Sequence, residues 1–173
     1  EAAPADDLAL AAAARGRRPG DYGSKPKLNL EPSESAEAAL RSMLGALLAT
    51  ARANLHGIRA DHDTEFLHDL RVAVRRSRSA LTQLDGVLPH EEVEPLVTEL
   101  RWLGNATGPC RDLDVFSLEL EGDDLRLEPS PADPLGPLRE AVARDRAAAH
   151  RELVGDLRSD RSARLFECWA AVA

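Results

Sequence analysis

The sequence predicts an all-α protein, and three observations support this fold class. Alanine and leucine dominate, β-branched residues are sparse, and aromatic residues make up only 3% of the 173 residues. Unbranched side chains lose little rotamer freedom in a helix, so this composition favours helices. Apolar residues recur at three- and four-residue steps, and no alternating strand pattern is present. Because aromatic residues are few, aliphatic contacts between helices must form the core, as in an antiparallel helical bundle.

The first 29 residues differ in composition from the rest of the chain. Residues 1–14 combine an acidic start with an alanine-rich end, and residues 15–26 are dense in glycine and proline. No regular hydrogen-bond ladder survives glycine and proline at that density. We therefore assign residues 1–29 to a linker or the end of a preceding domain, and residues 30–173 to a helical domain.

Within this domain the periodicity and the helix-breaking residues predict five or six helical segments. The first begins after the cap-like Ser33 and continues to Leu55, and residues 56–64 form a polar turn. The second covers residues 65–88 and ends before Pro89, and the third covers residues 91–107. Gly108 and Pro109 break or kink the path, because proline suits the first turn of a new helix. Residues 121–137 are acidic and proline-rich, so we expect an exposed loop between this region and two last helices, at residues 138–157 and 159–173.

Charge and cysteine usage narrow the functional classes. The net charge of −8 argues against a general nucleic-acid coat protein. It does not exclude a polyanion site, because the position of the 22 basic residues decides that question. No apolar run approaches the roughly 20 residues that span a bilayer, and no export signal is visible. Cys110 and Cys168 form no CxxC pattern, so we expect a reduced, cytoplasmic protein in which neither cysteine binds a metal.

One helix carries a row of cationic residues. At about 100° per residue, Leu67, Leu70 and Val74 lie on one side of this helix. Four residues, which we call the basic row, lie together on the opposite side: His68, Arg71, Arg75 and Arg78. Arg76 lies at the margin of the row.

Like charges at this spacing repel by a few tenths of a kcal/mol per pair, and only two acidic residues are nearby. The row suits a linear anion, because guanidinium groups hold phosphate in a bidentate fork and protonated histidine donates hydrogen bonds. An arginine-rich surface helix that pairs with acids on neighbouring helices explains the same pattern. Helical spacing alone does not choose between the two interpretations.

The ordered motifs around the row resemble those of the CHAD family, the conserved histidine α-helical domain. The family's signature helix is His-x-x-Arg-Val-x-x-Arg-Arg-x-Arg, and every fixed position is matched here by His68, Arg71, Val72, Arg75, Arg76 and Arg78. A second element resembles Leu-x-x-Leu-Gly-x-x-Arg-Asp-x-Asp-Val, with Arg111, Asp112, Asp114 and Val115 at its end. A third and weaker element begins at His150. The resemblance extends from about Leu30 to the C-terminus.

This resemblance implies a non-catalytic domain of two related four-helix-type halves around a basic groove that binds inorganic polyphosphate, in association with polyphosphate granules. By position, it implies seven polyphosphate-binding residues: His68, Arg71, Arg75, Arg76, Arg78, Arg111 and His150. Arg101 is a weaker candidate, and the two aspartates of the second motif are expected to orient arginines. No cofactor or metal is implied.

The chain shows only one helix with the signature register, so the resemblance covers the N-terminal half of the family domain. We therefore expect the chain to pair with a second CHAD half or with another chain. CHAD domains often follow a CYTH-type triphosphate-processing domain, and residues 1–14 are candidates for the last helix of such a domain.

Three other functions remain open from the residues alone. A metal-dependent His-Asp phosphohydrolase would use His68 and Asp69, with His56, His62 and Asp112 as further ligands. Those first two residues are about 100° apart on the helix, however, and neighbouring arginines would repel a cation. A nucleic-acid binder would read the same phosphates, but it typically adds aromatic stacking platforms. A helical scaffold could dock an acidic protein partner on the same surface.

Overall fold

The computed structural model of the protein describes residue 28 and residues 30–124 and 135–173. These residues form helices connected by short turns, and none of them lies in a strand. The helices are α2 (Ala36–Arg59), α3 (Thr64–Gln83), α4 (His90–Ala106), α5 (Gly108–Asp124), α6 (Gly136–Arg158) and α7 (Asp160–Val172). The all-α prediction is confirmed.

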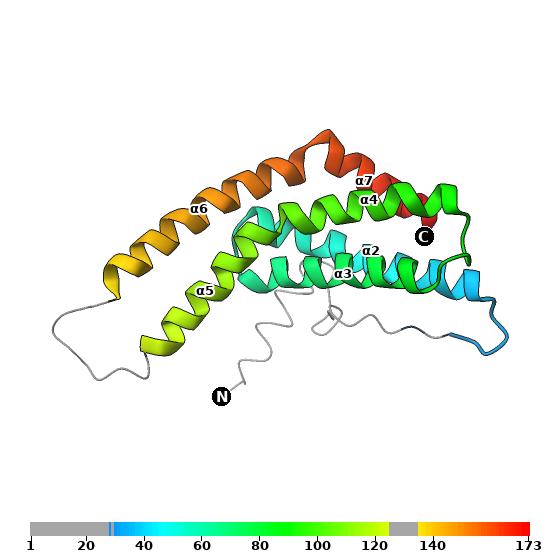
Figure 1. Ribbon diagram of the computed structural model, residues 1–173, viewed down its shortest axis with the longest axis horizontal. Coiled ribbons are helices and arrows are strands. Elements are labelled where there is room, and N and C mark those ends of the chain that lie inside the picture. Colours follow the sequence, from blue (N-terminus) through cyan, green and yellow to red (C-terminus); the bar gives the residue numbers. More distant parts are fainter. Residues whose placement is uncertain (1–27, 29, 125–134) are drawn as a thin grey trace, which may run out of the picture.

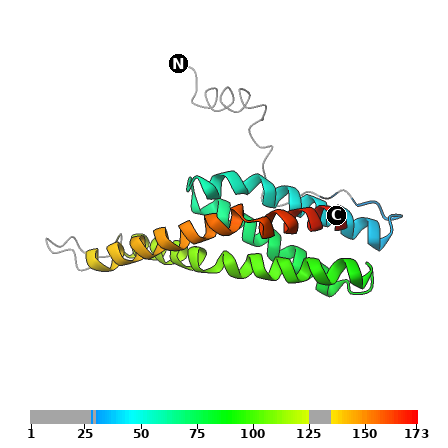
Figure 2. The ribbon, with the colours of Figure 1, turned by 90° about the horizontal axis from the view of Figure 1, so that it is seen from above.

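Four helices form a bundle, and the other two project from it. Helices α2, α3, α4 and α7 pack in a ring, with contacts between α2 and α3, α3 and α4, α4 and α7, and α7 and α2. Helices α5 and α6 pack against each other and form an arm that extends beyond one end of the bundle (Figures 1 and 2). Each arm helix continues a bundle helix, because α4 leads into α5 at Thr107 and α6 leads into α7 at Ser159.

The core of the bundle is aliphatic, as its composition predicts. Burial of one leucine side chain in such a core contributes about 1.5–3 kcal/mol to the stability of the fold, relative to leaving it exposed. Trp169 of α7 is completely buried as well, so one large aromatic side chain contributes to this otherwise aliphatic core. The leucines with at most 1% exposure come from all four bundle helices and from α6: Leu40, Leu44, Leu70, Leu96, Leu100, Leu103, Leu153 and Leu165.

The first turn differs from its prediction. The side chain of Ser35, rather than Ser33, caps α2, and α2 continues through the predicted polar turn as far as Arg59. The helix persists because Gly57 and Ile58 are buried, and a side chain at Gly57 would come within 2.4 Å of the Phe66 ring of α3. The connection therefore shrinks to residues 60–63, where Asp61 has a positive φ of 50°.

Two later boundaries also differ. Helix α3 ends at Gln83, before the predicted Leu88, and Gly86 follows with a φ of 79° that a glycine adopts without strain. Leu88 is buried nonetheless, which explains its place in the apolar pattern. Helix α5 begins at Gly108 with Pro109 in its first turn, as predicted, but it extends to Asp124, inside the predicted acidic loop.

Most of residues 1–29 and the remainder of the acidic loop, residues 125–134, lie outside the described residues. The predicted linker, and the proposed origin of residues 1–14, therefore stay predictions. None of the helices described is long and apolar enough to cross a bilayer.

Candidate anion-binding site

The basic row lies on the side of α3 that faces α4 and the bend between α4 and α5. Its first and last members, His68 and Arg78, are ten positions apart, which corresponds to about 15 Å along the helix axis. His68, Arg71 and Arg78 are half-buried, whereas Arg75 is exposed. Most of the row is therefore partly buried against neighbouring parts of the chain and does not lie on a fully exposed helix face.

Arg71 is held at the bend between α4 and α5. Its Nη1 donates hydrogen bonds to the Gly104 carbonyl oxygen at 2.9 Å and to the Thr107 Oγ1 at 2.8 Å. Carbonyl groups in the last turn of a helix lack partners within the helix and carry partial negative charge, so a cation is favourable there. Arg71 thus braces the C-terminal end of α4, and only part of its guanidinium group is available to a ligand.

A polar hollow of about 290 Å³ lies between α3 and α4 further along the row. Arg75 and Arg78 of α3 line it together with Arg101 of α4. The rest of its lining is polar except for Val97: Ser79, Thr82 and Gln83. The buried Arg78 Nε atom has no acceptor among the described residues. Three guanidinium groups and several hydrogen-bonding side chains around one hollow offer donors of the kind that an anion accepts from.

Arg111 extends this cationic surface onto α5. Its Nη1 is 3.5 Å from the carbonyl oxygen of Thr64, the first residue of α3. Arg111 therefore lies at the end of α3 where the basic row begins. The structure gathers five arginines from three helices around α3 and the bend between α4 and α5, and we call them the cationic surface: Arg71, Arg75, Arg78, Arg101 and Arg111. His68 joins them through its helical spacing from Arg71 and is half-buried.

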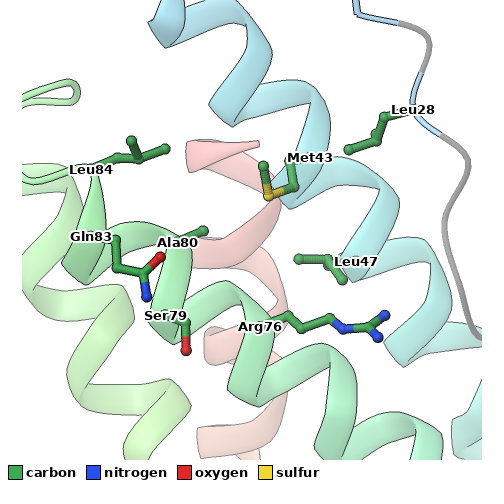
Figure 3. A pocket seen from close by; sticks show the side chains of 8 residues that line it. All are labelled: Leu28, Met43, Leu47, Arg76, Ser79, Ala80, Gln83 and Leu84. Carbon is green, nitrogen blue, oxygen red and sulfur yellow. The ribbon is translucent and has the colours of Figure 1, made fainter.

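Arg76 and His150, the other two predicted ligands, lie elsewhere. Arg76 points toward α2 (Figure 3) and lines a different pocket, of about 520 Å³, with mainly apolar side chains that include Met43 and Leu47. His150 lies on α6, where its Nε2 is 2.7 Å from the Ile58 carbonyl oxygen. Neither residue lines the polar hollow.

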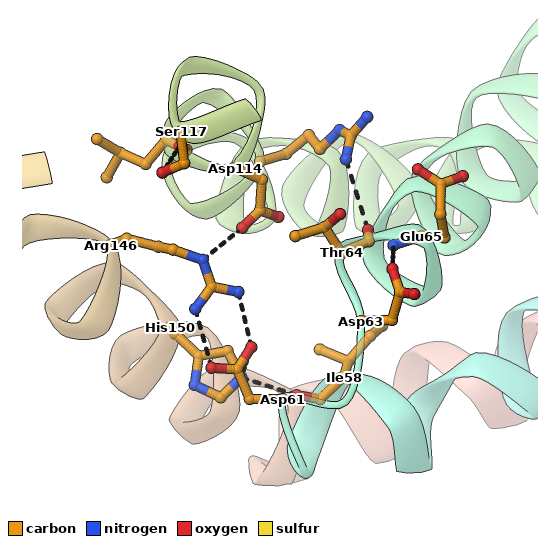
Figure 4. Close-up of polar contacts among 11 residues, drawn as sticks. Ile58, Asp61, Asp63, Thr64, Glu65, Asp114, Ser117, Arg146 and His150 are labelled. Carbon is orange, nitrogen blue, oxygen red and sulfur yellow. Dashed lines mark hydrogen bonds and ion pairs between the residues drawn. The ribbon is translucent and has the colours of Figure 1, made fainter. Parts of the chain in front are cut away.

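His150 belongs to an ionic cluster that ties the arm to the bundle (Figure 4). Arg146 of α6 donates two hydrogen bonds to Asp61 in the turn after α2, at 2.7 and 2.9 Å. Its Nε donates a third to Asp114 of α5 at 2.7 Å. The His150 ring is 3.9 Å from Asp61. We call these four residues the ionic cluster.

The two carboxylates of the ionic cluster respond in opposite directions to one guanidinium group. The hydrogen bonds from Arg146 lower the pKa of Asp61 from its ordinary 3.8. Burial raises the pKa of Asp114 despite its own bond to Arg146, because this side chain is only 1% exposed and its Oδ2 has no donor in the described part of the chain. Burial also raises the pKa of the neighbouring Cys110 thiol to about 11, so this cysteine is not a nucleophile at neutral pH.

Three arginines outside the cationic surface differ from those on it, because they pair with carboxylates. Arg41 pairs with Glu37 and Glu92, and Arg146 pairs with two aspartates as described. Arg161 pairs with Glu99 and stacks on the Trp102 ring, 4.5 Å from its centroid. Within the described ranges, no carboxylate forms an ion pair with Arg75, Arg78 or Arg101. These arginines therefore do not fit the interpretation of the row as a helix face that neighbouring acids neutralise.

The ligands imagined for a metal site do not come together. The rings of His56 and His62 lie 5.8 Å apart. Among the described residues, however, no group of three histidine, cysteine, aspartate or glutamate side chains could hold an ion. Asp112, another of these candidates, is exposed on α5.

Comparison with known proteins identifies the family. The CHAD domain sequence profile matches residues 42–173, which include the basic row, Arg111 and His150. The chain belongs to the CHAD family. No curated protein matched the chain.

A solved CHAD structure agrees with the fold described here. The crystal structure of the CHAD domain from the plant Ricinus communis is similar, with a TM-score of 0.71 and 28% sequence identity. The similarity covers 87% of this chain but 49% of that one. The chain therefore spans about half the length of the solved CHAD domain.

Sequence reasoning missed Arg146 and ranked Arg101 low. The one local indication of a role for Arg146 is its position one helical turn before His150. Its partners, Asp61 and Asp114, are 85 and 32 residues away in sequence. Arg101 follows Leu100 in the second CHAD motif, and only the packing of α4 on α3 shows that it shares a hollow with the row.

Proposed function

We propose that this CHAD chain is a non-catalytic module that binds inorganic polyphosphate along the basic row, Arg101 and Arg111. The observation that carries the proposal is the set of arginines around the polar hollow, Arg75, Arg78 and Arg101, which have no carboxylate partner among the described residues. Arg41, Arg146 and Arg161, in contrast, form ion pairs elsewhere on the molecule. Neighbouring guanidinium groups without carboxylate partners repel one another. An anion with closely spaced charges would offset this repulsion and accept their hydrogen bonds.

A polyphosphate ligand accounts for the site better than a nucleic acid does. The hollow between α3 and α4 has no aromatic side chain in its lining, and single-strand binders gain much of their affinity from bases stacked on aromatic rings. An acidic protein partner would use the same charges. Polyphosphate, however, offers a denser linear charge than an acidic peptide, and the row repeats its cations at every helical turn.

The proposal includes the cellular setting and the rest of the site. Association with polyphosphate granules in the cytoplasm follows from the ligand rather than from any separate targeting feature. The CHAD family implies a groove formed by two related halves, so a second CHAD half or another chain would supply the facing wall. We therefore expect this chain alone to bind with lower affinity than a pair of halves.

Titration of the chain with size-fractionated polyphosphate tests the proposal, with single-stranded RNA and a glutamate-rich peptide as competitors. Polyphosphate should bind more tightly than either competitor, and affinity should fall steeply with salt as condensed counterions are released. Phosphate release should stay at background whether or not divalent metals are added. Equal or tighter binding of RNA would contradict the proposed ligand, and turnover of polyphosphate would contradict the non-catalytic role.

A further inference from the structure

Asp114 of α5 is a buried carboxylate with two cations close to it. Its side chain is only 1% exposed, and its Oδ2 atom has no donor among the described residues. Arg146 of α6 donates to its Oδ1 atom at 2.7 Å. Arg111 lies three residues earlier on α5, at a spacing where arginine and aspartate pair on a helix. Burial raises the pKa of Asp114, and the charges of Arg146 and then Arg111 act on it in the opposite direction.

Arg111 does not pair with this carboxylate in the structure. Its guanidinium group reaches the start of α3 instead, where Nη1 is 3.5 Å from the Thr64 carbonyl oxygen. Among the residues described, it forms no ion pair with a carboxylate. A hydrogen bond of that length is weak, and a guanidinium group has five N–H donors. Most of the donors of Arg111 are therefore available to an anion.

Arg146 bridges the two chain segments that meet at the contact between Arg111 and Thr64. Asp61, in the turn before α3, precedes Thr64 by three residues. Asp114 follows Arg111 by three residues on α5. One guanidinium group joins the two aspartates, with bonds of 2.7 and 2.9 Å to Asp61 and of 2.7 Å to Asp114 (Figure 4). The bridge therefore fixes the start of α5 beside the start of α3, where the basic row begins.

Without Arg146, Asp114 would be a buried charge that has lost its counterion, which is strongly unfavourable. The carboxylate would then either take up a proton or attract the other cation. Protonation at neutral pH requires its pKa to rise above the ambient pH. A turn of the Arg111 side chain toward Asp114 costs only the long hydrogen bond to Thr64. The second response is therefore favoured, and it withdraws one arginine from the cationic surface.

We propose that Arg146 is a positioning residue for the anion site, because it neutralises Asp114 and so leaves Arg111 available to the ligand. Arg146 itself does not contact the ligand. This inference rests on the proposed function, in which Arg111 is one of the residues that bind polyphosphate. It gives the ionic cluster a role in ligand binding besides the attachment of the arm.

Polyphosphate titration at several salt concentrations and neutral pH tests this role. Arg146→Met removes the counterion and keeps an unbranched side chain that suits a helix. Loss of one phosphate contact should reduce the slope of log affinity against log salt concentration by about 0.7. Arg111→Ala should have the same effect, and the two replacements together should reduce the slope no further. Arg146→Met combined with Asp114→Asn should regain the slope of the parent, because Arg111 then has no carboxylate to pair with.

Three further variants separate this role from a loosened fold and from net charge. Asp61→Asn breaks the other half of the bridge but leaves Asp114 paired, so its slope should match that of the parent. Arg151→Ala removes one exposed charge of α6 and should also match. Arg146→Gln is uncharged but still donates hydrogen bonds, so it serves if the methionine variant does not fold. A parental slope without the Arg146 charge overturns the proposal, as does a double variant whose slope stays reduced.

Urea unfolding of the same variants tests the pairing without a ligand. If Arg111 turns toward Asp114, Arg111→Ala should lower the unfolding midpoint more in the Arg146→Met background than in the parent. Asp114→Asn should abolish this difference. Equal shifts in both backgrounds overturn the proposal. A parent that binds no polyphosphate contradicts the proposed function, and the midpoints then decide by themselves whether Arg146 keeps Arg111 from Asp114.

Discussion

Arg75 and Arg101 offer the cleanest perturbation of the cationic surface. Both line the polar hollow, both are exposed, and neither has a carboxylate partner among the described residues. Their joint replacement by alanine should therefore remove two charges from the ligand site without breaking a contact that holds the fold. Arg71 is unsuitable for this purpose, because it braces the end of α4.

The magnitude follows from counterion release. Each phosphate contact on a single-stranded polyanion contributes about 0.7 to the slope of log affinity against log salt concentration. Two lost contacts should reduce this slope by about 1.4. Between about 50 and about 200 mM salt, the parent should therefore lose about sevenfold more affinity than the variant.

Fluorescence anisotropy with end-labelled polyphosphate at several salt concentrations measures both slopes. The control replaces two exposed arginines of α6, Arg144→Ala and Arg151→Ala, and so removes the same net charge away from the hollow. Its slope should match that of the parent. If the slopes of the Arg75 and Arg101 variant and of the parent are parallel, the hollow is not where phosphate binds. If the control loses as much slope, binding depends on net charge and not on this site.

Three further predictions concern stability. Arg71→Ala should lower the free energy of unfolding in urea by about 1–3 kcal/mol, because the buried Thr107 at the end of α4 loses a charged donor; an unchanged unfolding midpoint would contradict the bracing role. Gly57→Ala should destabilise the fold severely, since the added carbon would lie 2.4 Å from an aromatic ring, whereas Gly155→Ala meets nothing within 4 Å and should raise the thermal midpoint; similar midpoints for both would refute the packing argument. Asp61 has a lowered pKa, so its ionised form stabilises the fold above pH 3.8 and this contribution is lost as the pH falls through the lowered value; the stability difference between the parent and Asp61→Asn should shrink in that window, and a constant difference would count against the ion pair.

Local patterns in the sequence predicted the helices well but their ends less well. The apolar period located α2 and α3, and Pro109 marked the start of α5 because a proline in the first turn has no N–H to lose. The polar residues at the end of α2 predicted a turn, but the burial of Ile58 and the fit of Gly57 against α3 extend the helix. Such extensions depend on tertiary contacts, which a local window does not contain.

The candidate site shows the same division. The spacing within α3 correctly placed Arg71, Arg75 and Arg78 on one face, because those positions depend on helix geometry alone. It could not show that part of the Arg71 guanidinium group donates a hydrogen bond to Thr107, or that Arg76 points toward α2. Both facts depend on which helices lie on either side of α3. The pairing of Arg146 with Asp61 and Asp114 could not be predicted from the sequence, because these residues lie in three separate segments.

The continuity of the arm with the bundle has a thermodynamic consequence. Helices α5 and α6 are not an appendage on a flexible tether, since each runs directly into a bundle helix. A change in the angle of the arm must therefore displace Thr107 at the bend, where the guanidinium group of Arg71 is anchored. The angle of the arm and the occupancy of the cationic surface then depend on the same residues, and any free energy that couples them acts equally in both directions.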